Sequence, residues 1–311
     1  MPQWIRDTEL GDGFCQTTLK FEDDYDGPVT ATLVRNHPLV NARGRAVLYI
    51  HGFIDYFFQR HVAARFNDEG YDFYGLDLRK YGRSLGAGTH PNFCKDFSEY
   101  FAEIERSIEI MSDTRHADVV LMAHSTGAIP SALYAKYGAQ RDRIARMIFN
   151  SPFLAFKEPA AAVAIAAALG RMFPFARRKN PVCEWYGPSL HASRWGEWMF
   201  NTDLKPIAGF DAFYGWIRAV VRAQDEIARG LGLPQRILVL HSDRSRCDPQ
   251  WSEALHFADL ILDVKDIARC SPKLGANVAL RVIPGGKHDL VLSREPHRNE
   301  ALRAMIEWLA S

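Results

Sequence analysis

The chain of 311 residues is long enough for one large α/β domain with an insertion, or for two domains of ordinary size. Its composition, 47% hydrophobic and 24% charged, is typical of a globular protein. The formal net charge of +1 gives no electrostatic reason to expect a nucleic acid or an anionic membrane as a partner.

The first strands are expected to form an antiparallel hairpin, because residues 14–21 and 28–34 have β-like patterns and flank the acidic turn 22–27. Short continuous apolar runs follow and alternate with helix-like segments at 60–70 and 97–111. This alternation indicates βαβ units and a mostly parallel sheet with helices on both faces. The runs lie at residues 46–50, 71–76, 119–123 and 146–150.

The alternation stops at residue 151, where the chain becomes helix-like and rich in aromatic residues. Strand patterns return at 236–241 and 277–283, and an amphipathic helix is predicted at 300–310. We therefore predict a core domain of residues 1–150 and 234–311 with a helical cap, residues 151–233, inserted in it.

Two features of the whole chain concern its environment. The N-terminus has acidic residues and a tryptophan where a signal peptide has an apolar core, and no apolar stretch reaches the roughly 18 residues of a membrane span. The cysteines are scattered and odd in number, which favours reduced thiols over a disulfide framework or a zinc site. We expect a cytoplasmic location without a transmembrane segment. The cysteines are Cys15, Cys94, Cys183, Cys247 and Cys270.

Residues 121–127, LMAHSTG, end an apolar run at Ser125 and continue into the helix-like segment 132–137. This pattern predicts a sharp strand-to-helix turn with the serine at its tip. It matches the G-x-S-x-G nucleophile elbow, except that Ala123 stands at the position of the first glycine. A plain turn is the alternative interpretation of so short a motif.

Two further segments support a nucleophile at Ser125. The residues after the first buried run, His51-Gly52-Phe53, lie where this architecture places an oxyanion hole, so we expect the backbone amides of Phe53 and Thr126 to bind the oxyanion. A serine also needs a histidine base and an orienting carboxylate. His288 follows the last apolar strand and a pair of glycines, in the chain order expected for this elbow.

Together these segments resemble the α/β-hydrolase superfamily, and more narrowly its monoacylglycerol lipase and lysophospholipase branch, which overlaps with the serine aminopeptidase-like group. The resemblance rests on the HG turn at 51–52, the DLRKYGRS loop at 77–84, the elbow, SPFL at 151–154 and GGKHD at 285–289. Residues 200–207, FNTDLKPI, are similar to a cap segment of monoacylglycerol lipases. The resemblance implies hydrolysis of carboxylic esters of lipids, with neither a cofactor nor a metal.

The triad acid is harder to assign. The family usually places it a few residues after the strand at 236–241, which indicates Asp243 or Asp248. The family acid is also followed by two apolar residues, a break and a helix, and the segment 259–270 has this pattern with Asp259 as the acid and Asp263 near the helix start. We favour Asp259, and the other three carboxylates stay open.

The expected substrate is a small ester or lipid with an apolar acyl group, because the cap is rich in Trp, Phe and Tyr. We expect residues 160–169 to form a buried cap helix in preference to an interfacial one, and a transient contact with a membrane surface stays open. The alternatives are an aminopeptidase-like amidase and a catalytically silent ligand-binding protein. A short acidic cluster in the cap would support the amidase by binding an α-amine, but Glu158, Glu184 and Glu197 are only scattered there. The oligomeric state is open.

Overall fold

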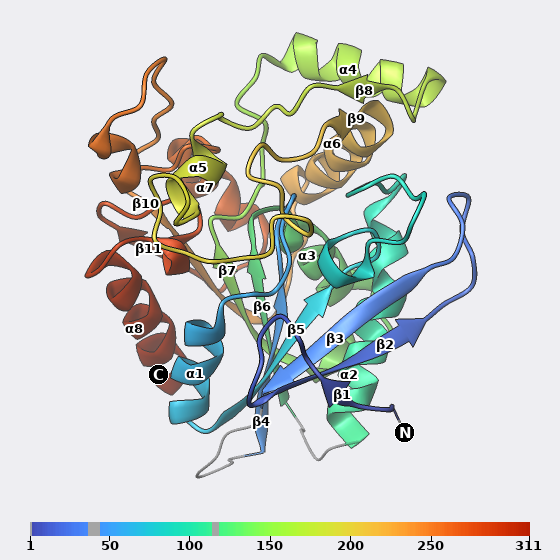
Figure 1. The fold of residues 1–311 in the computed structure, drawn as a ribbon, viewed down its shortest axis with the longest axis vertical. Coiled ribbons are helices and arrows are strands. Elements are labelled where there is room, and N and C mark those ends of the chain that lie inside the picture. Colours follow the sequence, from blue (N-terminus) through green and yellow to red (C-terminus); the bar gives the residue numbers. More distant parts are fainter. Residues whose placement is uncertain (1, 37–43, 114–117) are drawn as a thin grey trace.

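The computed structural model describes residues 2–36, 44–113 and 118–311. Across these residues nine strands form one mostly parallel sheet in the order β1-β2-β3-β5-β4-β6-β7-β10-β11 (Figure 1). The predicted α/β fold is therefore confirmed. The strands are β1 Ile5–Arg6, β2 Phe14–Lys20, β3 Thr30–Asn36, β4 Arg45–Ile50, β5 Tyr71–Asp77, β6 Asp118–His124, β7 Ile144–Asn150, β10 Arg236–Ser242 and β11 Val278–Ile283.

The central strands are buried on both faces because helices cover both sides of the sheet (Figure 1). Successive side chains of β6 alternate between two cores, with Leu121 on one side and Met122 on the other. One core includes α2 and α3, and the other includes α1 and α8. These helices are α1 Arg60–Asp68, α2 Phe101–Asp113, α3 Ala128–Tyr137 and α8 His297–Ala310.

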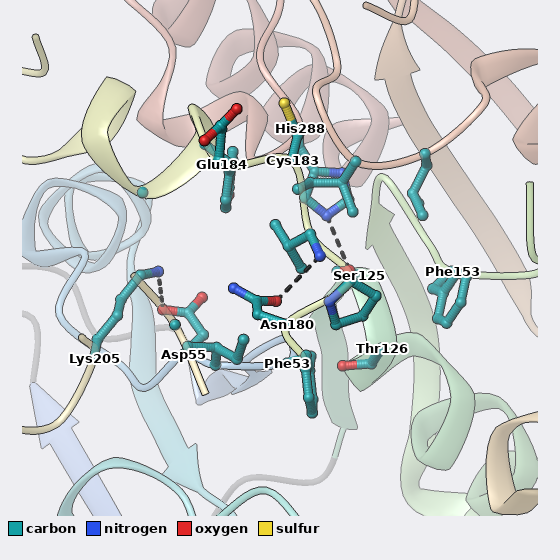
Figure 2. A pocket seen from close by; sticks show the side chains of 18 of the residues that line it. Phe53, Asp55, Ser125, Thr126, Phe153, Asn180, Cys183, Glu184, Lys205 and His288 are labelled. Atoms are coloured by element: carbon teal, nitrogen blue, oxygen red, sulfur yellow. Dashed lines mark hydrogen bonds and ion pairs between the residues drawn. The ribbon is translucent and has the colours of Figure 1, made fainter. Parts of the chain in front are cut away.

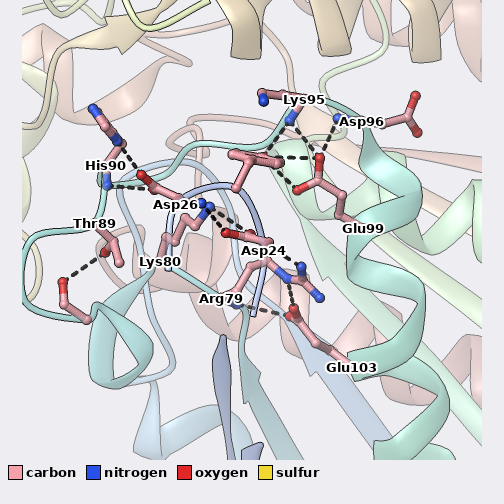
Figure 3. Close-up of polar contacts among 12 residues, drawn as sticks. Asp24, Asp26, Arg79, Lys80, Thr89, His90, Lys95, Asp96, Glu99 and Glu103 are labelled. Atoms are coloured by element: carbon pink, nitrogen blue, oxygen red, sulfur yellow. Dashed lines mark hydrogen bonds and ion pairs between the residues drawn. The ribbon is translucent and has the colours of Figure 1, made fainter. Parts of the chain in front are cut away.

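Strands β2 and β3 pair antiparallel, as the sequence predicts, and the turn between them is held by buried charges (Figure 3). Lys80 lies between two carboxylates of that turn, with its Nζ 2.9 Å from Asp24 and 3.2 Å from Asp26. Arg79, next to it, pairs with Asp24 and with the buried Glu103 of α2. These contacts attach the hairpin to the DLRKYGRS loop.

Residues 151–233, called the cap segment below, lie above the carboxyl ends of the strands (Figure 1). The helix α4 packs on α6 through small residues, since Ala166 and Gly170 are buried. Its other side chains are largely exposed, including Ile165 (64%) and Met172 (69%), so the expectation of a buried helix is wrong. The cap segment contains α4 Ala160–Met172, β8 Arg177–Arg178, α5 Tyr186–Leu190, β9 Ala212–Phe213 and α6 Tyr214–Ala228.

The cysteines also differ from the prediction. Cys183 of the cap segment and Cys247 form a disulfide across 64 positions of sequence, with Cα atoms 6.1 Å apart. Cys15, Cys94 and Cys270 are free thiols. Sequence spacing did not reveal the bonded pair because the two residues meet only when the cap segment folds over the core.

Within the described ranges, none of the helices is long and apolar enough to span a bilayer.

Candidate active site

Ser125 lies at the tip of the turn between β6 and α3. Its φ of +51° is in the left-handed region, which few residues other than glycine adopt. The backbone of the turn is therefore strained, as a nucleophile elbow requires. Gly127 is needed because a Cβ there would lie 2.3 Å from the carbonyl oxygen of His51 and 2.7 Å from that of Ile50. The small residues of the motif therefore allow the elbow to pack against the end of β4.

His288 lies between Ser125 and Asp259. Its Nε2 is 2.9 Å from Ser125 Oγ, and its Nδ1 is 2.9 Å from Asp259 Oδ2. The other carboxylate oxygen of Asp259 accepts hydrogen bonds from the backbone amides of Ile261 and Leu262, each at 2.8 Å. The carboxylate is thus fixed by two donors on one side and faces the imidazole with the other.

The three competing acids have other roles. Asp243 Oδ1 accepts a hydrogen bond from the backbone amide of Gly285 at 2.8 Å, which steadies the loop before the histidine. Asp248 pairs with the neighbouring Arg246, and Asp263 caps the N-terminus of α7, Val264–Cys270. None of these three carboxylates is among the described partners of the histidine.

The two predicted oxyanion donors belong to residues close to the serine. A Cβ at Gly52 would be 3.0 Å from Ser125 Cβ, so the backbone just before Phe53 packs closely against the serine. Thr126 follows Ser125 at the start of the turn. The ring of Phe53 stacks on Trp216 of α6 at 4.2 Å, which fixes this loop against the cap segment.

A cavity of about 120 Å³ opens in front of Ser125 (Figure 2). One part of its wall is apolar and includes Phe153, Phe156, Trp216, Ile217 and Leu262. Another part carries polar groups, with Asp55 and Lys205 on one side of the cavity in Figure 2. The cavity therefore combines an apolar wall with a separate polar region beside the serine.

The polar region contains a buried ion pair that sequence analysis missed. Lys205 Nζ lies 2.5 Å from Asp55 Oδ1, and the second oxygen of Asp55 is 3.5 Å from His124 Nδ1. Burial opposes the ionisation of Asp55, but the Lys205 ammonium together with His124 and His51 outweighs it and lowers the pKa of that carboxyl. Two features of the sequence could have indicated this pair. Asp55 lies two positions after Phe53, and Lys205 is the lysine of the segment FNTDLKPI.

The same region holds three side chains of types that bind metals. Asp55, His124 and Asp289 place one possible ligand atom each within 4.8 Å of one another, in the described part of the chain. The ammonium of Lys205 pairs with Asp55, and Asp289 accepts a hydrogen bond from Asn150 Nδ2 at 2.7 Å. Both carboxylates therefore have a partner within the protein.

Comparisons with known proteins agree with this architecture. A family model described as serine aminopeptidase, S33, matches residues 41–295. A soluble variant of monoglyceride lipase from Saccharomyces cerevisiae, solved with a substrate analogue, is 17% identical with a TM-score of 0.71, covering 95% of this chain and 96% of that one. Monoacylglycerol lipase from Paleococcus ferrophilus is 19% identical, with a TM-score of 0.65 and coverage of 94% and 98%.

A more distant likeness is to Est1E from Butyrivibrio proteoclasticus with ferulic acid bound, which is 17% identical with a TM-score of 0.56 and coverage of 94% and 100%. A search among curated protein sequences found no match. At these identities the structural likenesses establish the fold.

Proposed function

Because the chain belongs to the serine aminopeptidase (S33) family of α/β hydrolases, we propose that it is a serine hydrolase that cleaves carboxylic esters with apolar acyl groups. The observation that carries this proposal is the continuous path of hydrogen bonds from Ser125 through His288 to Asp259. Such a path is what a serine hydroxyl needs to become a nucleophile near neutral pH.

In the proposed mechanism, Ser125 Oγ attacks the ester carbonyl while His288 Nε2 accepts the hydroxyl proton. Asp259 holds the proton on His288 Nδ1 and stabilises the imidazolium that forms. The amides of Phe53 and Thr126 donate to the oxyanion. The histidine then gives its proton to the departing alcohol, and water releases the acyl group from the serine by the same steps.

The lining of the cavity supports a substrate class. The aromatic and aliphatic wall suits the acyl chain of an ester, and the polar region around Asp55 and Lys205 suits a polar alcohol group. Two of the similar structures are of proteins named as monoglyceride or monoacylglycerol lipases. We therefore propose esters of the monoacylglycerol or lysophospholipid type, with residues 151–233 acting as the cap over the site.

An amidase is the second candidate, in keeping with the name of the family. Glu158 and Glu184 both line the cavity, where a carboxylate would bind the α-amine of a peptide. Glu158 lies 3.8 Å from Arg178, however, and the third acid, Glu197, pairs with Arg298 instead. Two of the three acids are thus paired with arginines, which favours the ester, and Glu184 is the acid that an amidase would have to use. Comparing turnover of p-nitrophenyl butyrate with that of an aminoacyl p-nitroanilide separates the two.

We propose that α4 brings the protein to a lipid surface. Ile165, Met172 and Phe173 are exposed on or next to this helix, and the basic run 177–179 follows it. Apolar side chains flanked by cations fit an anionic bilayer. Co-sedimentation should be stronger with vesicles of phosphatidylcholine and phosphatidylglycerol than with phosphatidylcholine alone. Ile165→Ser with Met172→Ser should weaken it and leave hydrolysis of a water-soluble ester unchanged.

We also propose a cytoplasmic location, for which the three free thiols count and against which the Cys183–Cys247 disulfide counts. Cell fractionation tests it. Membrane-free and membrane fractions, collected with and without high salt, also show whether the protein is held at a lipid surface in the cell.

The central test is a fluorophosphonate probe read by intact mass. The native protein should gain a single adduct, and Ser125→Ala should gain none because the attacking oxygen is absent. A folded native protein that stays unlabelled would contradict an assembled triad and favour a ligand-binding role. An adduct that persists in Ser125→Ala would move the nucleophile to another residue.

A further inference from the structure

The Cys183–Cys247 disulfide connects two segments that both contact the active site. Cys183 is buried and lines the cavity, whereas Cys247 is exposed on the connection from β10 to Asp259. The covalent link therefore runs from the surface of the molecule to the cavity wall.

On the Cys247 side, the neighbouring residues support the backbone of the triad acid. The amide of Arg246 donates to the carbonyl of Asp259 at 2.8 Å, and the amide of Asp259 donates to the carbonyl of Arg244 at 2.9 Å. Ser245 Oγ accepts a hydrogen bond from the amide of Val264 at 2.8 Å. Residues 244–247 are all exposed, so the segment depends on these hydrogen bonds and on the disulfide to stay against the core.

On the Cys183 side, the following residues approach the catalytic histidine. Trp185 Nε1 donates to the carbonyl of Asp248 at 2.9 Å, beside the disulfide. The ring of Tyr186 packs edge-on against the imidazole of His288, with centroids 5.6 Å apart. The disulfide thus joins the segment that packs on the histidine to the segment that pairs with its carboxylate partner.

We propose that Cys183–Cys247 is a redox-sensitive strap whose reduction by a dithiol lowers turnover at Ser125. This inference rests on the proposed hydrolase function. A thiolate of the dithiol attacks the exposed Sγ of Cys247, the S–S bond breaks, and Cys183 leaves as a thiolate that takes up a proton. The second thiol of the dithiol then displaces Cys247, so two electrons and two protons pass to the protein and the dithiol becomes a disulfide.

The cap segment keeps other attachments when the strap opens. Lys287 Nζ, next to the catalytic histidine, donates to the carbonyl and hydroxyl oxygens of Ser189 at 2.8 and 3.0 Å. Trp198 Nε1 donates to the carbonyl of Leu292 at 2.8 Å. These contacts hold α5 and the chain after it against the core, so reduction should loosen the two strapped segments without unfolding the cap segment.

The test compares protein purified without reductant before and after treatment with dithiothreitol. Alkylation and intact mass should show two additional thiols after treatment. With p-nitrophenyl butyrate we expect kcat to fall by about tenfold with a smaller change in KM, because the carboxylate loses its support while the acyl site stays formed. Hydrogen exchange should rise in residues 183–185 and 244–262 only, because the contacts of Ser189 and Trp198 keep α5 in place.

The matched controls are two cysteine variants. Cys183→Ala with Cys247→Ala should resemble the reduced protein and no longer respond to dithiothreitol, whereas Cys270→Ser should keep the full response. If the double variant does not fold, titration of the native protein with the dithiol still decides. The strap is refuted if both thiols appear while kcat and exchange stay unchanged, or if both cysteines are alkylated before any reductant is added.

The hydrolase proposal can fail separately. A native protein with the strap closed that neither turns over esters nor reacts with the fluorophosphonate refutes the hydrolase function. Hydrogen exchange in 244–262 would still report whether the disulfide holds that segment. The two failures therefore give different results.

Discussion

Replacing Asp259 by asparagine should inactivate the enzyme through the tautomer of His288. One oxygen of Asp259 accepts two backbone hydrogen bonds, from Ile261 and Leu262, so the asparagine carbonyl oxygen must stay there. The new amide group then points its N–H at His288 Nδ1, which has to become an acceptor. The proton moves to Nε2, which faces Ser125 and can no longer take its proton.

The expected loss in kcat is about 10⁴-fold, the size seen when a triad aspartate becomes asparagine. This corresponds to about 5 kcal/mol of activation free energy. Because the backbone bonds to Ile261 and Leu262 are retained, the unfolding midpoint in urea should change little. Steady-state turnover of p-nitrophenyl butyrate and the rate of fluorophosphonate labelling both measure the effect.

The matched control is Asp243→Asn, whose carboxylate accepts a hydrogen bond from Gly285 and does not face the imidazole. An asparagine oxygen can accept the same bond, so turnover should fall by less than about tenfold. The reasoning is wrong if Asp259→Asn keeps turnover within tenfold of the native protein. A large loss in Asp243→Asn alone would transfer the role of triad acid to that residue.

Three further substitutions test the surroundings of the site by urea unfolding. Lys205→Met should destabilise the protein by about 3–5 kcal/mol at neutral pH, because it leaves Asp55 buried without its cation. In the native protein the pKa of Asp55 is lowered, so the stabilisation from this pair is present above about pH 4 and is lost as the pH falls through the lower folded value. Burial lowers the pKa of Lys287 to about 7, so stability should rise between pH 7 and about 10, where the unfolded chain binds the additional proton, and Lys287→Met should remove that slope. Gly127→Ala should cost about 1–3 kcal/mol or more, because the added methyl group meets the carbonyl oxygen of His51; an unchanged midpoint would contradict this close packing.

Much of the architecture could be predicted because it depends on local patterns. Strands β4, β6 and β7 are continuous apolar runs, as required when a strand is covered on both faces. The elbow at Ser125 was recognisable because close packing around the turn allows only small residues there, such as Gly127. Asp259 was preferred from the turn that follows it, and this turn is the one whose amides hold the carboxylate.

The features that were missed depend on contacts between distant parts of the chain. Asp55 and Lys205 are 150 positions apart, and from the sequence alone each residue would be predicted to be an ordinary surface charge. The disulfide likewise joins Cys183 to a loop 64 positions away. The exposure of α4 was misjudged because an apolar composition does not show whether a neighbour covers the helix. Among the residues of α4, Ala166 and Gly170 are the buried ones, and both are small.

The charged cluster around the hairpin turn also bears on the order of assembly. Its members, from Asp24 to Glu103, all lie in the first third of the chain, so this part can dock while the rest is still being synthesised. The proposed nucleophile, Ser125, lies 163 positions before His288, its proposed base. A nascent chain would therefore expose the elbow before the residues that are proposed to activate it have been synthesised.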